Sequence, residues 1–333
     1  MRINGVSYTS LDAMRNDVPT DVVDFLVEWY SDAPSLRGYT SGSTGVPKPI
    51  ELLKSDMLAS ARLTNSYLGI DAHSTLLLCL SPSYIAGKMM IVRAIASGAQ
   101  LVVVSPSSTP LVGLDVAITM AAMVPMQVAE TLRQADGEAQ LACVSKLLVG
   151  GAPVDDVLEQ KLMTLPVETY VTYGMTETVS HVALRRVGET CYTAIGDVTF
   201  ATDERGCLVI DAPQLSGRRF VTNDIVQIVD ACRFRWLGRY DNVIMSGGLK
   251  FCAEQLEAKI AHLIPRRYYI MAAPDERLGQ RVVLVIEGRP YDEVALQQLR
   301  IELSTCMSRY EMPRDIRFIE HFAETSSGKV KRQ

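Results

Sequence analysis

The chain has 333 residues, which is enough for about two domains at ~150 residues each, and 48% of them are hydrophobic, so a sizeable core can form. The net charge of −5 and the absence of lysine or arginine runs argue against nucleic acid as a partner. Seven scattered cysteines without C-x-x-C spacing indicate reduced thiols in a cytoplasmic protein. The four histidines lack zinc-ligand spacing, and no apolar run suits a signal peptide or membrane insertion.

Helical and strand-like runs alternate along the first half of the chain. The lead-in of 38 residues predicts one helix, with Val22, Phe25 and Trp29 among its apolar residues. Buried strands are predicted at 76–80, 101–104, 116–118, 146–149 and 167–172, and helices at 55–67, 87–96, 126–134 and 154–163. This alternation indicates an α/β domain built on a layered, largely parallel sheet.

The pattern changes after Gly174. Short strand-like runs at 195–200, 207–210, 225–229 and 234–237 predict a small antiparallel β unit. Beyond Asp241, strands are predicted at 268–272 and 282–286, with helices around Leu256 and Leu299, which together indicate a small α+β module. We therefore expect one domain over residues 1–239 and a second over 240–333.

A glycine- and hydroxyl-rich loop precedes a single lysine. Its small residues can point backbone N–H groups and hydroxyls at one centre, and Lys48 adds a positive charge, a combination that suits a polyphosphate. The spacing is not the Walker pattern, and the alternative is a flexible Ser/Gly linker. The predicted phosphate-binding residues are Thr40, Ser41, Gly42, Ser43, Thr44, Gly45 and Lys48.

Two further motifs follow predicted strands. Gly150-Gly151-Ala152-Pro153 comes after the strand at 146–149, where α/β folds bind ligands, although an ordinary turn would read the same way. In Tyr173-Gly174-Met175-Thr176-Glu177-Thr178, the tyrosine could stack on a base or pack locally, and Gly174 lets a backbone approach a ligand. Thr176 and Glu177 offer the oxygen ligands that Mg²⁺ prefers; the alternative is a polar loop without a ligand.

Taken in order, these motifs resemble those of the adenylate-forming superfamily, the acyl-CoA synthetases and their relatives. Thr222-Asn223-Asp224, the segment Gly238 to Gly248 and the tail Thr325 to Arg332 resemble the later motifs of that family. The resemblance covers about residues 36–332 and implies binding of ATP, Mg²⁺ and coenzyme A together with a carboxylic acid. Asn223 and Glu324 depart from the usual glycine and proline, and Asp224 alone could equally be a turn residue.

The resemblance also implies roles for individual residues. Gly150, Gly151 and Ala152 would border the adenine, Tyr173 would stack on it, and Thr176 with Glu177 would position phosphate and metal. Asp224 would bind the ribose, Arg239 the ribose or phosphate, and Lys329 the reacting carboxylate and α-phosphate. Asp241 would be the hinge of the small domain, and Gly247 with Gly248 would leave room for pantetheine. We expect Glu254 and Glu257 to lie on a solvated helix face.

Two segments are similar to o-succinylbenzoate–CoA ligases of menaquinone biosynthesis, namely 81–93 and 178–186. That acid has a second carboxylate, and the candidates to bind the acid are Tyr84, Lys88, Arg93 and His181. The alternative for Lys88 and Arg93 is a position on a helix exterior.

Most members of the family carry well over a hundred residues before the phosphate loop, whereas 38 residues precede Tyr39 here. We therefore expect a short form whose acyl-pocket wall is reduced or supplied by a homodimer partner. Alternatives are another acyl-CoA ligase, an enzyme that loads a carrier protein, or a nucleotide-binding protein without catalytic activity.

Overall fold

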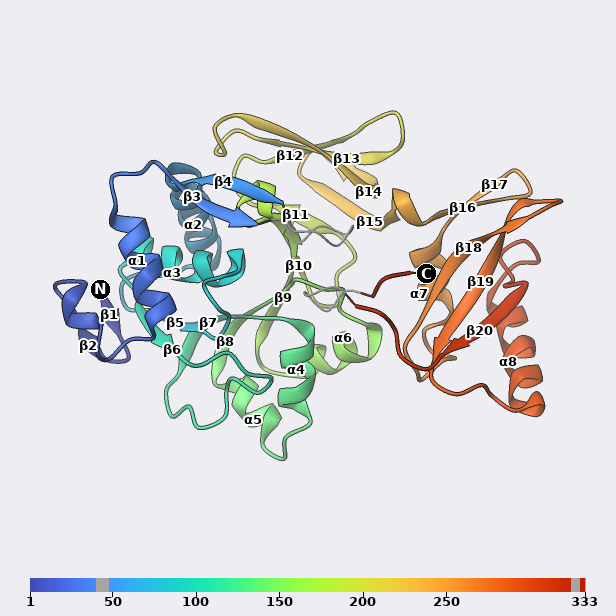
Figure 1. Ribbon diagram of the computed structural model, residues 1–333, viewed down its shortest axis with the longest axis horizontal. Coiled ribbons are helices and arrows are strands. Elements are labelled where there is room, and N and C mark those ends of the chain that lie inside the picture. The colour runs from blue at the N-terminus through green and yellow to red at the C-terminus, as the bar shows by residue number, and fades with distance from the viewer. Residues whose placement is uncertain (40–47, 325–329, 333) are drawn as a thin grey trace. The chain divides into compact units, whose positions relative to one another are not determined.

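The computed structural model describes residues 1–39, 48–324 and 330–332 (Figure 1). The chain divides into two compact units. Unit 1 comprises residues 1–199 and 211–220, and unit 2 comprises residues 200–210 and 221–333. The predicted boundary between residues 239 and 240 is the hinge about which the C-terminal part would rotate. A single structure does not test rotation, so the boundary stays a prediction.

Unit 1 is built on a large sheet with strand order β11-β10-β9-β8-β7-β5-β6-β1-β2. The pairings from β9 through β8, β7, β5 and β6 to β1 are all parallel, whereas β2, β10 and β11 join antiparallel. The strands are β1 (Arg2–Ile3), β2 (Val6–Ser7), β5 (Thr75–Leu78), β6 (Gln100–Val103), β7 (Ile118–Met123), β8 (Val144–Val149), β9 (Glu168–Gly174), β10 (His181–Arg186) and β11 (Tyr192–Ala194). The largely parallel α/β sheet is therefore confirmed.

Helices cover the faces of this sheet because its strands are apolar on both sides. Alternate residues such as Leu77, Met123 and Leu147 form one core with Val128 and Leu158 from the helices. The helices of unit 1 are α1 (Thr20–Tyr30), α2 (Lys54–Leu68), α3 (Ile85–Ser97), α4 (Pro125–Leu132), α5 (Gly137–Ala142) and α6 (Asp156–Met163), with short 3₁₀ turns η1 (Asp12–Met14) and η2 (Thr176–Thr178). Strands β3 (Ser35–Tyr39) and β4 (Pro49–Leu53) pair antiparallel and flank the predicted phosphate loop.

The predicted helices are confirmed to within a few residues, but the strand at 116–118 was placed too early. Strand β7 begins at Ile118 and runs through Met120, Ala121 and Met123, residues that are common in helices. Parallel neighbours on both sides, β5 and β8, override that preference by pairing with its backbone. The short helix α5 was missed.

Unit 2 begins with the neighbouring strands β12 (Thr199–Thr202), β13 (Cys207–Ala212), β14 (Arg218–Asp230) and β15 (Arg233–Arg239). Strands β14 and β15 pair antiparallel, as predicted for this region. A single 3₁₀ turn, η3 (Tyr240–Asn242), then leads into the C-terminal module.

The C-terminal module is a five-stranded sheet with two helices on one face. Its elements are β16 (Val243–Ser246), β17 (Leu249–Cys252), α7 (Ala253–Ile260), β18 (Tyr268–Asp275), β19 (Gly279–Glu287), α8 (Glu293–Cys306) and β20 (Asp315–Ile319). Leu256 of α7 and Leu303 of α8 pack on Ile270 and Leu284 of the sheet. Asp292 caps α8 by accepting from the Ala295 N–H at 2.8 Å. Among the described residues, no helix is long and apolar enough to span a membrane.

Candidate active site

The two glycine-containing motifs of unit 1 meet at the carboxyl ends of neighbouring parallel strands. Val149 of β8 is in register with Val171 of β9, so Gly150 lies beside Thr172. A Cβ on Gly150 would stand 2.1 Å from the Thr172 Oγ1, which leaves no room for a side chain there. Gly151 has φ +85°, a conformation that favours glycine. This is the sheet edge at which α/β folds bind ligands.

Tyr173 ends β9 with its side chain half-buried. Its ring centroid lies 5.6 Å from that of Tyr192 on β11, with the planes at 60° in an edge-to-face arrangement. The guanidinium carbon of Arg185 lies 5.6 Å from the Tyr192 ring centroid. Neither Tyr192 nor Arg185 was singled out from the sequence, because no motif marks residues that act through a neighbouring ring.

Gly174 is close to backbone of its own sheet. A Cβ there would meet the Ser180 carbonyl oxygen at 2.4 Å and the His181 Cα at 2.5 Å. Gly174 pairs with His181 across β9 and β10, where the ladder is irregular. The glycine is therefore required by the fold at this point, whatever it allows a ligand to do.

The segment after Gly174 holds Thr176 buried and Glu177 half-buried. The Thr178 hydroxyl accepts from the Met175 N–H at 3.0 Å and donates to the Ser180 carbonyl at 2.8 Å. These bonds hold Val179 at φ +60°, which is a strained conformation for a β-branched residue. The turn is thus fixed rather than a loose polar loop.

The Glu177 carboxylate takes part in no hydrogen bond or ion pair within the described part of the chain. Mg²⁺ needs only a few oxygen ligands from the protein when phosphate and water supply the rest. A partly buried carboxylate next in sequence to the Thr176 hydroxyl could provide them. The described residues contain no cluster of three histidine, cysteine, aspartate or glutamate side chains that could hold a metal alone.

Arg93, which is buried, forms a polar cluster with Ser180 and His181, which are half-buried. Arg93, on α3, is 2% exposed, so it does not lie on the helix exterior, and its Nη2 donates to the Ser180 Oγ at 2.7 Å. Within the described chain Arg93 has no acidic partner, and its Nε has no hydrogen bond. Burial lowers the pKa of Arg93 to about 10, so the side chain stays charged at neutral pH.

The His181 Nε2 lies 3.0 Å from the Thr64 Oγ1, and its Nδ1 lies 3.4 Å from the Ser180 Oγ. Burial, with the charge of Arg93, holds the pKa of His181 well below its ordinary value, so the imidazole is neutral at pH 7. The cluster therefore has one net positive charge, from Arg93.

The other two candidates for binding the acid, Lys88 and Tyr84, do not contact this cluster. The Lys88 Nζ is 5.1 Å from the ring centroid of Phe25 on α1, a cation–π packing contact between helices. Tyr84 precedes α3 and is 62% exposed. Neither contact involves Arg93 or His181.

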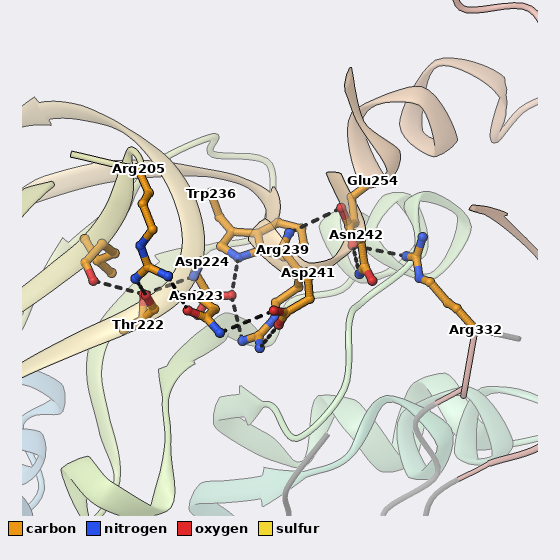
Figure 2. Close-up of polar contacts among 11 residues, drawn as sticks. Arg205, Thr222, Asn223, Asp224, Trp236, Arg239, Asp241, Asn242, Glu254 and Arg332 are labelled. Atoms are coloured by element: carbon orange, nitrogen blue, oxygen red, sulfur yellow. Dashed lines mark hydrogen bonds and ion pairs between the residues drawn. The ribbon is translucent and has the colours of Figure 1, made fainter. Parts of the chain in front are cut away.

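Unit 2 brings three predicted residues into one polar network (Figure 2). The Asp224 Oδ1 accepts from the Trp236 Nε1 at 3.2 Å and from the Arg239 Nη1 at 3.3 Å. Arg239 also donates to the Asp241 Oδ2 at 3.0 Å. The Asp224 N–H donates to the Thr222 Oγ1 at 3.1 Å, which fixes the backbone before the carboxylate. A carboxylate held in this way suits the ribose-binding role expected for Asp224.

Asn223, which stands where the resembled family has glycine, links this network to a residue that the sequence did not single out. Its side chain donates to the Asp241 Oδ1 at 3.4 Å and accepts from the Arg205 Nη1 at 2.9 Å (Figure 2). The Arg205 guanidinium also lies 5.1 Å from the Tyr240 ring centroid. The residues around Asp241 are thus tied to the strands before it.

Gly247 and Gly248 form the two-residue turn between β16 and β17. Their φ angles are +58° and +82°, and the flanking Ser246 and Leu249 pair directly. Such hairpins need positive φ at both central positions, which explains the two glycines. The fold alone therefore requires them, and a role beside pantetheine stays a prediction.

The expectation that Glu254 and Glu257 lie on a solvated helix face is wrong. Both side chains on α7 are less than 20% exposed, because Arg332 from the C-terminal tail packs against them. The Arg332 guanidinium lies 3.2 Å from Glu254 and contacts Glu257 at 2.6 and 3.0 Å. Glu254 also accepts from the Arg239 N–H at 3.3 Å and from the Asn242 Nδ2 at 2.5 Å (Figure 2).

Seven predicted site residues lie outside the described ranges, namely Thr40, Ser41, Gly42, Ser43, Thr44, Gly45 and Lys329. Lys48 is described and is exposed directly before β4. Arg332, three residues after Lys329, is described and donates to Glu257.

Comparison with protein families gives a match over residues 15–215 to the family described as AMP-binding enzyme. The chain belongs to the AMP-binding enzyme family. The matched region includes both glycine motifs of unit 1 and the Arg93–His181 cluster.

Individual AMP-binding relatives agree with this membership. A probable 2-succinylbenzoate–CoA ligase of Mycobacterium tuberculosis is 28% identical over 92% of this chain and 84% of its own length. The crystal structure of an acyl-CoA synthetase (AMP-forming)/AMP-acid ligase II-like protein from Dyadobacter fermentans is 38% identical, with TM-score 0.66 over 96% of this chain and 93% of that one. The o-succinylbenzoate CoA synthetase MenE of Bacillus subtilis, in complex with OSB-AMP, shares the fold at TM-score 0.72 and 18% identity, over 90% of this chain and 68% of its own.

Proposed function

We propose that the protein is an ATP-dependent acid–CoA ligase. It joins a carboxylate to the AMP part of ATP, releases pyrophosphate, and then transfers the acyl group to the thiol of coenzyme A. The observation that carries the proposal is that Gly150 lies beside Thr172, the residue before Tyr173, at the carboxyl edge of the sheet, in a chain of the AMP-binding family. The 2-succinylbenzoate–CoA ligases among its relatives support this reaction type.

In the first step the carboxylate oxygen attacks the α-phosphorus of ATP and pyrophosphate leaves. No protein nucleophile is needed, so the residues act by positioning and by neutralising charge on the phosphates. We assign Gly150, Gly151, Ala152 and Tyr173 to the adenine, and Asp224 and Arg239 to the ribose and phosphate. Lys48, the residues Thr40 to Gly45, and Thr176 are assigned to the phosphates.

Glu177, beside Thr176, is the residue that would hold Mg²⁺, which supplies positive charge to the phosphates. Lys329 is assigned to the developing charge on the carboxylate and α-phosphate.

We propose o-succinylbenzoate, an intermediate of menaquinone biosynthesis, as the acid. Its second carboxylate needs a positive counter-charge, and Arg93 is a buried cation without an acidic partner in the described chain. Ser180 and His181 are half-buried and contact Arg93 or each other, so they can present hydrogen-bonding groups to the acid while Arg93 supplies the charge. Tyr84 and Lys88 stay candidates for the acid pocket.

In the second step the coenzyme A thiol attacks the acyl-adenylate. We propose that residues 240–333 turn about Asp241 between the steps, with Gly247 and Gly248 beside pantetheine in the second. A cytoplasmic location and a homodimer that completes the acyl-pocket wall stay predictions; the first is supported by seven free thiols.

The test is product analysis with ATP–Mg²⁺, coenzyme A and a panel of acids: o-succinylbenzoate, benzoate, cinnamate and medium-chain fatty acids. The proposal predicts AMP, pyrophosphate and o-succinylbenzoyl-CoA in equal amounts, with strong preference for that acid. Turnover of a different acid would keep the reaction and contradict the substrate. ATP binding without turnover of any acid would contradict the proposed activity.

A further inference from the structure

Tyr192 lies next to the predicted adenine-binding ring without belonging to any motif. We propose that Tyr192 is a positioning residue for nucleotide binding: it holds the Tyr173 ring in the orientation that stacks on adenine. The inference rests on the proposed function, because it takes Tyr173 as the residue that contacts the base.

The first support is the geometry of the two rings. Their centroids are 5.6 Å apart and their planes meet at 60°. Edge-to-face pairs at such distances are favourable, worth about 0.5–1.5 kcal/mol beyond the area they bury. Tyr173 is half-buried at the end of β9, so part of its side chain is accessible to a ligand. Contact with a second, fixed ring restricts the rotation of the Tyr173 side chain before a ligand binds. Less conformational entropy is therefore lost when the ligand binds.

The second support is that Tyr192 is itself held. The Arg185 guanidinium lies 5.6 Å from its ring centroid. Arg185 contacts both oxygens of Glu159 at 2.5 and 2.8 Å and donates to the Glu189 carbonyl at 2.7 Å. The side chains of Arg185 and Glu159 are 14% and 15% exposed, and a bidentate pair with so little exposure is geometrically well defined.

Glu159 is ionised in this arrangement. Burial disfavours its charge, but hydrogen bonds from Arg185 and from the Gly188 N–H outweigh that effect and hold its pKa below the ordinary value. The pair therefore persists across the neutral pH range.

The third support is where this chain of contacts begins. Glu159 lies on α6, the helix that directly follows the Gly150-Gly151-Ala152-Pro153 segment. Contacts then run from α6 to Arg185 on β10, to Tyr192 on β11 and to Tyr173 on β9. The two predicted walls of the adenine site, the glycine segment and the Tyr173 ring, are thus fixed to each other by a second route besides the β8–β9 pairing.

The experiment compares Tyr192→Leu and Tyr192→Phe in the full-length protein. The dissociation constant of ATP is measured by calorimetry, and steady-state constants are measured with o-succinylbenzoate. We expect Tyr192→Leu to weaken ATP binding about 3–10-fold, which corresponds to the loss of one aromatic pair. The KM for the acid and kcat at saturating ATP should stay close to those of the wild type. Tyr192→Phe keeps the ring and should keep the affinity.

The matched control is Tyr67→Leu. Tyr67 and Tyr170 form a comparable edge-to-face pair in the same unit, with centroids 6.2 Å apart, and neither residue is assigned to the adenine. This substitution should leave ATP binding unchanged. If Tyr192→Leu does not fold, as judged by circular dichroism, Tyr192→Met retains more buried volume and should show the same loss of ATP affinity.

Unchanged ATP affinity in a folded Tyr192→Leu or Tyr192→Met protein would overturn the inference and leave the proposed function intact. An equal rise of both KM values, or an equal effect of Tyr67→Leu, would also overturn it, because either result indicates general loosening of the unit. A wild-type protein that does not bind ATP would instead overturn the proposed function, and this inference with it.

Discussion

Arg93 holds a positive charge where the described chain offers no negative one. An unpaired buried charge costs several kcal/mol unless a partner arrives, so such a residue destabilises the fold in the absence of ligand. Residues of this kind are candidates for ligand binding because only a bound anion repays that cost. We therefore propose that Arg93 lowers the stability of the unliganded protein and strengthens binding of an anionic acid.

This argument predicts opposite effects of Arg93→Met on stability and on binding. The KM for o-succinylbenzoate should rise by roughly 10–100-fold, the value of a charged hydrogen bond of about 1.5–3 kcal/mol. The KM for benzoate, which has no second carboxylate, should change little. The free energy of unfolding in urea should stay equal or increase. Arg62→Met, an exposed arginine on α2, is the control. A variant that loses stability and uses both acids equally badly would contradict the assignment.

Glu257 gives a prediction for pH dependence. Burial raises its pKa to about 7, although Arg332 and the Ile270 N–H act in the other direction. The folded state then binds a proton between pH 4.5 and 7 that the unfolded state does not bind. The contribution of this group to stability is therefore present below about pH 4.5 and is lost as pH rises through 7.

In the Glu257→Gln variant this titration is absent. The free energy of unfolding of the variant, minus that of the wild type, should rise with pH between 5 and 7.5, with a slope of at most about 1.4 kcal/mol per pH unit. Urea unfolding at four pH values measures it, with the exposed Glu293→Gln as control. A difference that does not change with pH would show that Glu257 stays ionised throughout.

For single residues, a sequence motif identifies candidates for a site but does not show which side chains are buried. Asp224 was predicted from one motif and Arg239 with Asp241 from another, and the structure brings the three together. Glu254 and Glu257 looked like solvated helix residues because their partner, Arg332, is 75 positions beyond Glu257. Only the folded chain reveals that pair.

Among the elements, the paired strands β9 and β10 with the turn between them position five of the predicted residues of unit 1. Tyr173 and Gly174 end β9, Thr176 and Glu177 lie in the turn, and His181 begins β10. We therefore propose that the close approach of the two strands at Gly174 positions both the residues assigned to the nucleotide and those assigned to the acid.

Gly174→Ala should disturb both sides at once. Its Cβ would clash with backbone atoms of Ser180 and His181, which cannot rotate away. We expect a loss of about 1–3 kcal/mol in the free energy of unfolding, together with weaker binding of both ATP and the acid. Gly69→Ala is a suitable control, because it strains a left-handed position without a clash and should cost stability alone. Normal binding of both ligands by Gly174→Ala would disprove this role for the strand pair.

Most of the predicted helices could be recognised because their apolar periodicity is strong, as in α1 and α7. The position of β7 could not, since its methionines and alanines favour helix and only pairing with β5 and β8 makes a strand. Likewise, Gly247 and Gly248 carry a motif, but the same residues are also those that a two-residue hairpin requires. A motif at a turn therefore does not by itself show whether its residues are required for function or for the fold.

On the scale of the whole molecule, the predicted site residues fall into two sets, one in each compact unit. Unit 1 contains the residues assigned to adenine and most of those assigned to phosphate and acid, and unit 2 contains Lys329 and the residues assigned to ribose, hinge and pantetheine. In the proposed two-step reaction, Lys329 would serve the first step and Gly248 the second, with residues 240–333 turning between them.

This division predicts that Lys329→Ala separates the two half-reactions. Adenylation should slow by about 10²–10³-fold, as for the loss of one preorganised charge at a transition state. Thioester formation from supplied acyl-adenylate should be little changed. Lys331→Ala, an exposed lysine two positions later, is the control. Equal loss of both half-reactions would show that Lys329 serves the fold of the tail instead.

The most direct test of the central claim is isotope exchange between pyrophosphate and ATP in the presence of Mg²⁺ and o-succinylbenzoate, without coenzyme A. If the protein forms an acyl-adenylate, labelled pyrophosphate should enter ATP only when the acid is present, and Arg93→Met should reduce the exchange with this acid. Exchange that needs coenzyme A, or that proceeds without any acid, would contradict an acyl-adenylate intermediate and with it the proposed reaction.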